Sequence, residues 1–138
     1  MPELPEVETM VRGLRLALES KRITRVEALR PDLRFPLPDD FIDRLTGCRV
    51  IEVVRRAKYI LVRLASGETW LVHLGMSGRF TVFPGTESTS SPVGHNPGRA
   101  LLQKHDHVIV DMADGGRIIF NDARRFGYMD LIPTDREA

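Results

Sequence analysis

Residues 49–83 read RVIEVVRRAKYILVRLASGETWLVHLGMSGRFTVF, and this stretch decides the fold. It contains four short runs that are rich in β-branched and aromatic residues, at 49–56, 59–65, 69–75 and 79–83. Turn residues such as Ser66-Gly67 separate these runs. Short runs of this composition that are bounded by turn residues predict β-strands.

The same pattern continues on both sides of this stretch. Further strand-like runs are at 22–29, 107–112, 117–122 and 128–132, and Asp114-Gly115-Gly116 is a turn between two of them. Short strands at this spacing are typical of an antiparallel sandwich or barrel. We expect an antiparallel β-sandwich of two sheets and about eight strands.

An amphipathic helix is expected before the first strand. Within residues 5–20, apolar residues recur at helical spacing: Val7, Val11, Leu14 and Leu18. A short second helix is expected from Asp39 to Leu45, with Asp39 or Asp40 as its N-cap and Gly47 just beyond its end. The predicted fold class is therefore mainly β with an N-terminal α-helix (α+β).

The composition is that of one soluble domain. The chain has 138 residues, of which 42% are apolar and 28% charged, and this excludes a disordered or fibrous polymer. A lone cysteine, Cys48, excludes an internal disulfide framework and a multi-cysteine zinc site. No apolar run approaches the ~20 residues that span a bilayer, and the start MPELPEVE has glutamates where a signal peptide has basic residues. We expect no membrane association and a cytoplasmic location.

The net charge of +1 conceals an uneven distribution of charge. Against the single carboxylate of Glu52, the segment 49–63 holds a cluster of basic residues: Arg49, Arg55, Arg56, Lys58 and Arg63. Arg124 and Arg125 form a second basic cluster. Local basic patches favour a polyanionic partner such as a nucleic acid. The alternative is that these are ordinary solvated side chains.

The N-terminus is a candidate nucleophile. If the initiator Met is removed, Pro2 has a free secondary amine, and an α-amino group with a pKa near ~7.7–8.0 is partly neutral at physiological pH. When such an amine attacks an aldehyde carbon it forms an iminium with no N–H to lose, which remains an electron sink for eliminations. Glu3 lies beside it and can move protons at the same carbon. The alternative is that Pro2 and Glu3 simply begin a helix.

Five separated segments resemble, in order, those of the bacterial formamidopyrimidine-DNA glycosylases, which excise oxidised purines. The segments are MPELPEVE (1–8), RRAKY (55–59), HLGMSG (73–78), KHDHV (104–108) and NDARRFG (121–127). The resemblance runs from residue 2 to about residue 132. The sister family that excises oxidised pyrimidines typically has PEGPE where this chain has PELPE, which favours the purine branch.

The resemblance implies a role for each of three residues at the catalytic centre. Pro2 matches the nucleophile that attacks C1′ of the damaged nucleotide, and Glu3 matches the acid/base that helps to open the sugar ring. Lys58 matches the lysine at the catalytic centre, where an ammonium holds a phosphate or carboxylate and disfavours protonation of the Pro2 amine. Without the resemblance, Lys58 is an exposed strand lysine.

The resemblance also implies a set of DNA-contacting residues: His73, Met76, His105, Arg124 and Phe126. Extruding a base leaves a space in the duplex, and an apolar wedge with an arginine suits that space. We expect Met76 and Phe126 to supply the wedge and Arg124 to hydrogen-bond the widowed base. The alternative for Met76 and Phe126 is ordinary core filling. Arg125 is expected to bind a phosphate or to form a structural ion pair.

The histidines are expected to bind DNA instead of a metal ion. His73 and His105 are predicted to donate to DNA phosphates, and internally satisfied histidines are the alternative. His105 and His107 alternate along a predicted strand, so they are expected to face opposite sides and to be poor joint metal ligands. We expect no metal and no cofactor in this chain.

Compared with the family, the chain covers one half. Family members are about twice this length, and their C-terminal half carries a helix–two-turn–helix unit and a four-cysteine zinc finger. We therefore expect residues 1–138 to be a single N-terminal catalytic domain, with the zinc finger absent and activity weak or lost in isolation. The expected partner is double-stranded DNA with an oxidised purine or an abasic site, bound by a monomer at the bacterial nucleoid. Residues 84–103, rich in Pro, Gly, Ser and Thr, are expected to form a mobile surface insertion.

Three other functions remain as alternatives. A retained Met1 would make the chain a catalytically silent module that binds damaged DNA. A glycosylase for oxidised pyrimidines, as in the sister branch, is the second. An unrelated enzyme that uses an N-terminal proline, such as a small tautomerase, is the third, and it is disfavoured because Pro2 precedes a Glu-rich helix start instead of an apolar strand.

Overall fold

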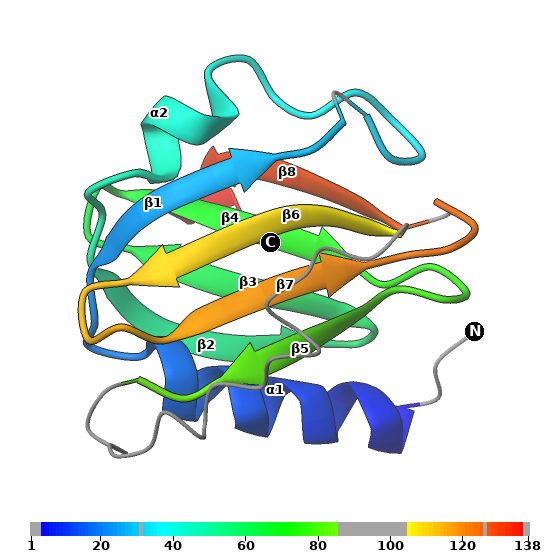
Figure 1. Ribbon diagram of the computed structural model, residues 1–138, viewed down its shortest axis with the longest axis horizontal. Helices are drawn as coiled ribbons and strands as arrows, with labels where there is room; N and C mark the ends of the chain where they lie inside the picture. The colour runs from blue at the N-terminus through cyan, green and yellow to red at the C-terminus, as the bar shows by residue number, and fades with distance from the viewer. Residues whose placement is uncertain (1–3, 31, 86–104, 126, 137–138) are drawn as a thin grey trace.

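The strands and helices begin and end close to where the sequence patterns predict them. The computed structural model describes residues 4–30, 32–85, 105–125 and 127–136 (Figure 1), so most of the segment 84–103 lies outside the described residues. The helices are α1 (Leu4–Leu18) and α2 (Phe41–Leu45), followed near the end of the chain by a 3-10 turn, η2 (Thr134–Arg136). No helix in these ranges is long and apolar enough to cross a membrane.

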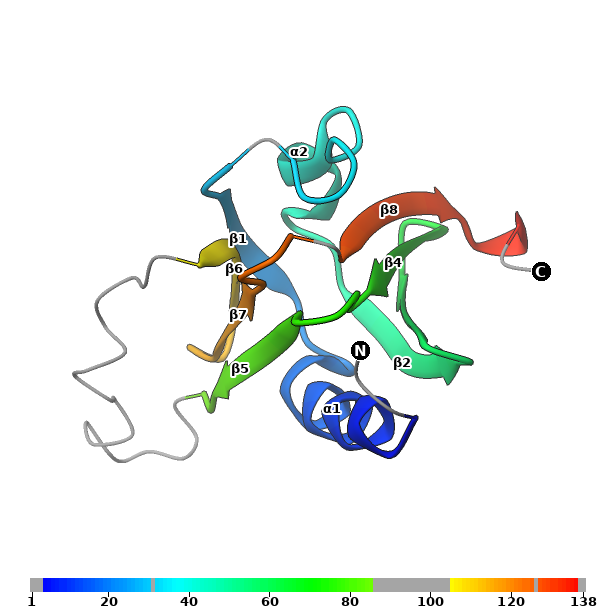
Figure 2. The same cartoon turned by 90° about the vertical axis from the view of Figure 1, so that its right-hand side faces the viewer.

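The described strands form two antiparallel sheets of four strands each. The strands are β1 (Ile23–Ala28), β2 (Val50–Arg56), β3 (Tyr59–Leu64), β4 (Glu68–His73), β5 (Arg79–Phe83), β6 (Asp106–Met112), β7 (Arg117–Asn121) and β8 (Tyr128–Pro133). One sheet has the order β1-β6-β7-β5 and the other has the order β2-β3-β4-β8. Figure 2 shows the two sheets facing each other, with α1 across one open side and α2 across the other. The predicted two-sheet sandwich is confirmed, and the barrel is excluded.

The core lies between the sheets and beneath α1. The apolar face predicted for α1 is buried, each residue being at most 1% exposed: Val7, Val11, Leu14 and Leu18. Burying a side chain of this size contributes ~1.5–3 kcal/mol, so packing against the sheets holds the helix. Trp70 of β4 and Phe120 of β7 are fully buried, and the ring of Phe80 contacts both, at 6.2 and 5.2 Å between centroids. Aromatic packing therefore joins the two sheets.

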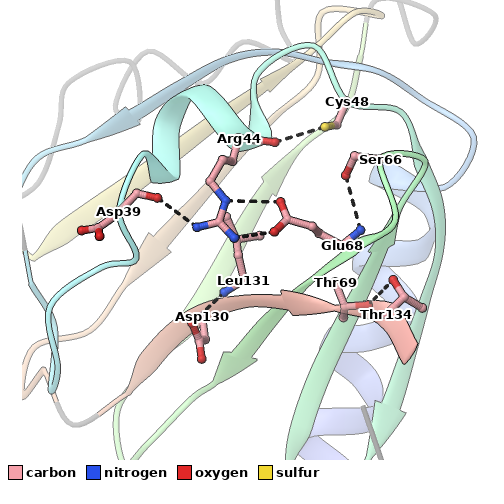
Figure 3. Close-up of polar contacts among 9 residues, drawn as sticks. All are labelled: Asp39, Arg44, Cys48, Ser66, Glu68, Thr69, Asp130, Leu131 and Thr134. Atoms are coloured by element: carbon pink, nitrogen blue, oxygen red, sulfur yellow. Dashed lines mark hydrogen bonds and ion pairs between the residues drawn. The ribbon is translucent and has the colours of Figure 1, made fainter. Parts of the chain in front are cut away.

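The start of α2 departs from the prediction. Asp40 is the N-cap residue, but its φ is 56° and its side chain makes no capping hydrogen bond. Instead, Arg44 donates to the carbonyl of Asp39 at 3.0 Å and forms an ion pair with Glu68 at the start of β4 (Figure 3). Asp40 is therefore the N-cap by position, as predicted, although its side chain does not cap, and the helix begins at Phe41 instead of Asp39. Gly47 lies just beyond the helix, as predicted.

We call the cluster of Arg44, Glu68, Thr69 and Thr134 the Glu68 end of the second sheet. The hydroxyl oxygens of Thr69 and Thr134 lie 3.0 Å apart in a hydrogen bond that joins β4 to the residue after β8 (Figure 3). The Arg44 guanidinium binds both carboxylate oxygens of Glu68. Charge and hydrogen bonding at this end are therefore satisfied within the protein.

Candidate active site and nucleic-acid interface

At the opposite end of β4, aromatic rings from three adjacent strands meet. The register pairs Tyr59 of β3 with His73 of β4, and His73 with Tyr128 of β8. The His73 ring stacks on the Tyr128 ring with centroids 5.3 Å apart, and the two tyrosine hydroxyls lie 2.8 Å apart in a hydrogen bond. Phe35 meets Tyr128 edge-on at 5.4 Å. We call this cluster of Phe35, Tyr59, His73 and Tyr128 the His73 end.

Hydrogen bonding decides which nitrogen of His73 can donate. The backbone N–H of Gly75 donates to Nδ1 of His73 at 3.1 Å, so the neutral ring carries its proton on Nε2. Burial lowers the pKa of His73, and the positive charges of Lys58 and Arg34 lower it further. Near neutral pH, His73 is therefore an uncharged ring with Nε2–H as its donor. Burial, together with the hydrogen bond that Tyr128 shares with Tyr59, raises the pKa of Tyr128 to about 12.

Lys58 lies in the tight turn between β2 and β3. Its predecessor Ala57 has a φ of 54°, in the left-handed region. The side chain of Arg55 donates to the Ala57 carbonyl at 3.0 Å and, through Nε, to Glu8 of α1 at 2.9 Å. The bond from Arg55 lowers the pKa of Glu8. One arginine thus ties the N-terminal part of α1 to the turn that carries Lys58.

Pro2 and Glu3 lie outside the described residues, and α1 begins immediately after them at Leu4. The bond between Glu8 and Arg55 places the early part of this helix beside the Lys58 turn. The positive charge of Lys58 also acts on His73, so the Lys58 turn borders the His73 end. Lys58 is half-buried, which contradicts the alternative of a fully exposed strand lysine.

Two loops leave the sheets next to His73. Loop 74–78 follows β4 and carries Met76, which is 45% exposed, so ordinary core filling is wrong for this residue. Loop 122–127 precedes β8 and carries Arg124, whose guanidinium donates to the sulfur of Met76 at 3.7 Å. The structure therefore brings Met76 and Arg124 together as an exposed pair. Phe126 lies outside the described residues.

Each of these loops ends in a glycine that the surrounding backbone requires. A Cβ on Gly127 would lie 2.6 Å from the His73 carbonyl oxygen, and a Cβ on Gly78 would overlap the Leu74 carbonyl oxygen.

Arg125 has a φ of 55° and is exposed, and no ion pair joins its side chain to another described residue. A structural ion pair, one of its two expected roles, is therefore not found in this part of the chain.

Sequence reasoning missed Asp122, the buried residue that connects the two loops. Its carboxylate accepts hydrogen bonds from the Ser77 hydroxyl at 2.6 Å and from the backbone N–H groups of Arg125 at 3.0 Å and Gly127 at 2.9 Å. The Ser77 hydroxyl oxygen in turn accepts from the Arg124 N–H at 3.1 Å. An acidic residue inside a basic loop that ends in glycine was the available signal.

His105 and His107 do not alternate along one strand. Strand β6 begins at Asp106, so His105 precedes it, and a register shift between Asp106 and Val108 places a bulge at His107. His107 is buried, and its Nε2 lies 2.8 Å from the backbone oxygen of Asp122, so it is an internally satisfied histidine. Across the ranges that the structure describes, no group of three His, Cys, Asp or Glu side chains could hold a metal ion.

The basic cluster at 49–63 is partly neutralised inside the protein. Arg55 pairs with Glu8 at 2.9 Å and Arg63 pairs with Glu52 at 2.6 Å. Because the charges of these two arginines are paired with carboxylates, the basic surface is smaller than the count of charges predicts. The cationic groups that act on His73 are Lys58 and Arg34.

Comparison with known proteins shows the family of this chain. Residues 1–129 match the family described as Formamidopyrimidine-DNA glycosylase N-terminal domain. The formamidopyrimidine-DNA glycosylase of Ruegeria pomeroyi is 56% identical over 137 residues, covering 97% of this chain and 46% of that protein. That of Caulobacter vibrioides is 52% identical over 136 residues, covering 99% of this chain and 47% of the relative.

A solved structure shares the fold. The Lactococcus lactis formamidopyrimidine-DNA glycosylase, non-covalently bound to DNA that contains an AP site, superposes with a TM-score of 0.79 at 30% identity. The match covers 99% of this chain and 47% of that one, so this chain spans about half the length of the relatives it matches. By a match over nearly all of its residues, the chain belongs to the formamidopyrimidine-DNA glycosylase family, through that family's N-terminal domain.

Proposed function

We propose that this chain is the catalytic half of a DNA glycosylase and AP lyase that removes oxidised purines such as 8-oxoguanine and formamidopyrimidines. One observation carries the proposal: segments far apart in the sequence converge at the His73 end. The Lys58 turn, loop 74–78 and loop 122–127 all adjoin the register row Tyr59–His73–Tyr128. A half-buried cation and an exposed apolar–arginine pair next to each other suit a nucleotide that has been turned out of a duplex.

The solved relatives support the choice of partner. Structures of the Lactococcus lactis protein contain DNA with an abasic site and DNA with a FAPY-dG, and a related structure contains a carbocyclic 8-oxo-G. We propose the same kind of partner here, namely double-stranded DNA with an oxidised purine or an abasic site, bound by a monomer at the bacterial nucleoid.

The proposed chemistry begins at the Pro2 nitrogen. Its lone pair forms a bond to C1′ while the bond from C1′ to the base breaks; the base leaves with that electron pair and takes up a proton, and the Pro2 nitrogen gives up its N–H proton. Glu3 protonates O4′ as the sugar ring opens, which leaves an iminium between Pro2 and C1′. Removal of a C2′ proton then expels the 3′ phosphate, and in the intact family a second elimination expels the 5′ phosphate. Lys58 holds a phosphate or carboxylate beside the amine and disfavours its protonation.

The proposed DNA contacts follow the exposed groups. Met76 and Phe126 fill the space that the extruded base leaves, and Arg124 hydrogen-bonds the widowed base. His73, through Nε2–H, and His105 donate to phosphates, as does Arg125. We assign the family's zinc ion to residues outside this chain, because one cysteine, Cys48, cannot build a four-cysteine finger. The Cys48 thiol instead donates a hydrogen bond to the Arg44 carbonyl at 3.2 Å.

Borohydride trapping on the full-length protein tests the proposal. Borohydride reduces an iminium to a stable amine, so a duplex with 8-oxoguanine or an abasic site should become covalently attached to the protein. Pro2→Gly should lose most of this adduct. An undiminished adduct would show that another nucleophile acts, and mass spectrometry that finds Met1 retained, with no adduct, would favour the silent DNA-binding module.

A further inference from the structure

Asp122 is a buried ionisable residue for which the proposed chemistry has no use. It is fully buried, and burying a carboxylate is costly unless hydrogen bonds compensate it. Within the described residues its side chain has no cationic partner, and both of its oxygens accept bonds from loop donors instead. Since burial of this carboxylate is unfavourable by itself, we expect Asp122 to fix the positions of the loop groups that donate to it.

The hydrogen bonds of Asp122 cross from one loop to the other. Ser77 of loop 74–78 donates to the carboxylate, while its oxygen accepts the N–H of Arg124 from loop 122–127. The backbone of Asp122 is itself anchored to β6 and the residue before it, through Nε2 of His107 at 2.8 Å and the carbonyl of His105 at 3.1 Å. A single serine hydroxyl thus couples the Met76 loop to a carboxylate that is fixed in the other sheet.

We propose that Ser77 and Asp122 form a clamp that makes loops 74–78 and 122–127 a single unit, so that Met76 and Arg124 enter the duplex together. This inference rests on the proposed function. The contact between the Arg124 guanidinium and the Met76 sulfur is the geometry that the clamp maintains. The two bonds from the Arg125 N–H to Asp122 also hold that residue in the left-handed region, where a side chain is strained. The clamp orders both loops before DNA binds, so less ordering entropy is lost on binding.

A double-mutant cycle in the full-length protein tests the clamp. The affinity for a duplex with a tetrahydrofuran abasic-site analogue is measured for Met76→Ala, Arg124→Ala and the pair, in the native background and with Ser77→Ala. In the native background, the factor by which the double variant loses affinity should differ from the product of the two single-variant factors by about three- to tenfold, as for coupled neighbours. With Ser77→Ala in the background, the factor for the double variant should equal the product of the two single-variant factors to within about twofold. Ser66→Ala, which removes a serine hydroxyl near the Glu68 end, is the matched control and should leave the coupling intact.

Variants of Asp122 separate positioning from folding. Asp122→Asn retains an Oδ1 acceptor for Ser77 and Arg125 and should keep most of the coupling, whereas Asp122→Ala should abolish it. If Asp122→Ala does not fold, Ser77→Ala carries the test, because it removes only the bridge. Hydrogen exchange of the free protein should show the Arg124 amide losing protection in Ser77→Ala.

The proposal is overturned if the coupling persists in Ser77→Ala, or if the Arg124 amide keeps its protection there. Failure of the proposed function has a different signature. In that case Met76→Ala and Arg124→Ala leave the affinity unchanged even in the native background, while the loss of amide protection in Ser77→Ala is still observed.

Discussion

The two ends of β4 differ in how charge is compensated, although the strand is only six residues long. At the Glu68 end, Arg44 and Glu68 neutralise each other and the hydroxyls of Thr69 and Thr134 pair (Figure 3). At the His73 end, the charges that act on the imidazole, Lys58 and Arg34, have the same sign and lower its pKa. Protein groups complete the first end, whereas the charged groups that act on the imidazole at the second end are both cationic, and cationic groups attract an anionic partner such as a DNA phosphate.

The largest expected effect comes from removing the cation at the His73 end. Lys58→Ala should lower the rate of base excision by about 10²–10³-fold, the range for the loss of one group that stabilises charge in a catalytic centre. Single-turnover cleavage of an 8-oxoguanine duplex by the full-length protein measures it. Lys21→Ala is the matched control, since that lysine pairs with Asp114 at 2.9 Å, and its rate should be native. Equal rates for the two variants would remove Lys58 from the catalytic centre.

Stability should distinguish a buried polar centre from a surface ion pair. Asp122→Ala leaves three loop donors without their acceptor and should cost about 3 kcal/mol of unfolding free energy. Arg44→Ala at the Glu68 end should cost about 1 kcal/mol, since both partners are roughly a third exposed and solvent screens the pair. Urea unfolding compares them, and a larger loss for Arg44→Ala would reverse the ranking of the two ends.

The smallest effect is a dependence of stability on pH that originates at His73. Because its pKa is lower in the folded chain than in the unfolded chain, the folded state favours the neutral ring. This contribution is present above the ordinary pKa near ~6.5 and is lost as the pH falls below it, through the folded pKa. Native protein should therefore lose more stability than His73→Gln between neutral and mildly acidic pH.

NMR titration provides the sharper form of that test. Lys58→Ala removes one of the positive charges that act on His73, so the pKa of His73 should move up toward its ordinary value. An unchanged titration would show that burial alone sets the pKa, and the electrostatic contrast between the two ends would fail.

Much of the fold is predictable because its signals are local. Each predicted strand run corresponds to an observed strand to within one or two residues, since β-branched and aromatic runs between turns are read without knowledge of the partner strand. The apolar face of α1 is likewise set by helical spacing. Ile51 shows the limit of such a pattern: a register shift between Val50 and Glu52 leaves it 52% exposed within a strand-like run.

The candidate site is only partly predictable. Motif resemblance selected Lys58, His73, Met76 and Arg124, and the structure brings the segments that carry them to one end of a sheet. The strand pattern placed His107 on a regular strand, where the structure has a bulge. The charge distribution placed Arg55 and Arg63 in a basic patch, although each has a carboxylate partner.

Local pattern therefore specifies which segments are strands and which face of α1 is apolar, because hydrophobic periodicity depends only on near neighbours in the chain. Tertiary packing decides which strands adjoin and which arginines are neutralised. The bond from Ser77 to Asp122 joins residues 45 positions apart, and no local pattern encodes such a pairing. Burial makes that bond necessary, since a carboxylate inside the protein must find its donors wherever the fold brings them.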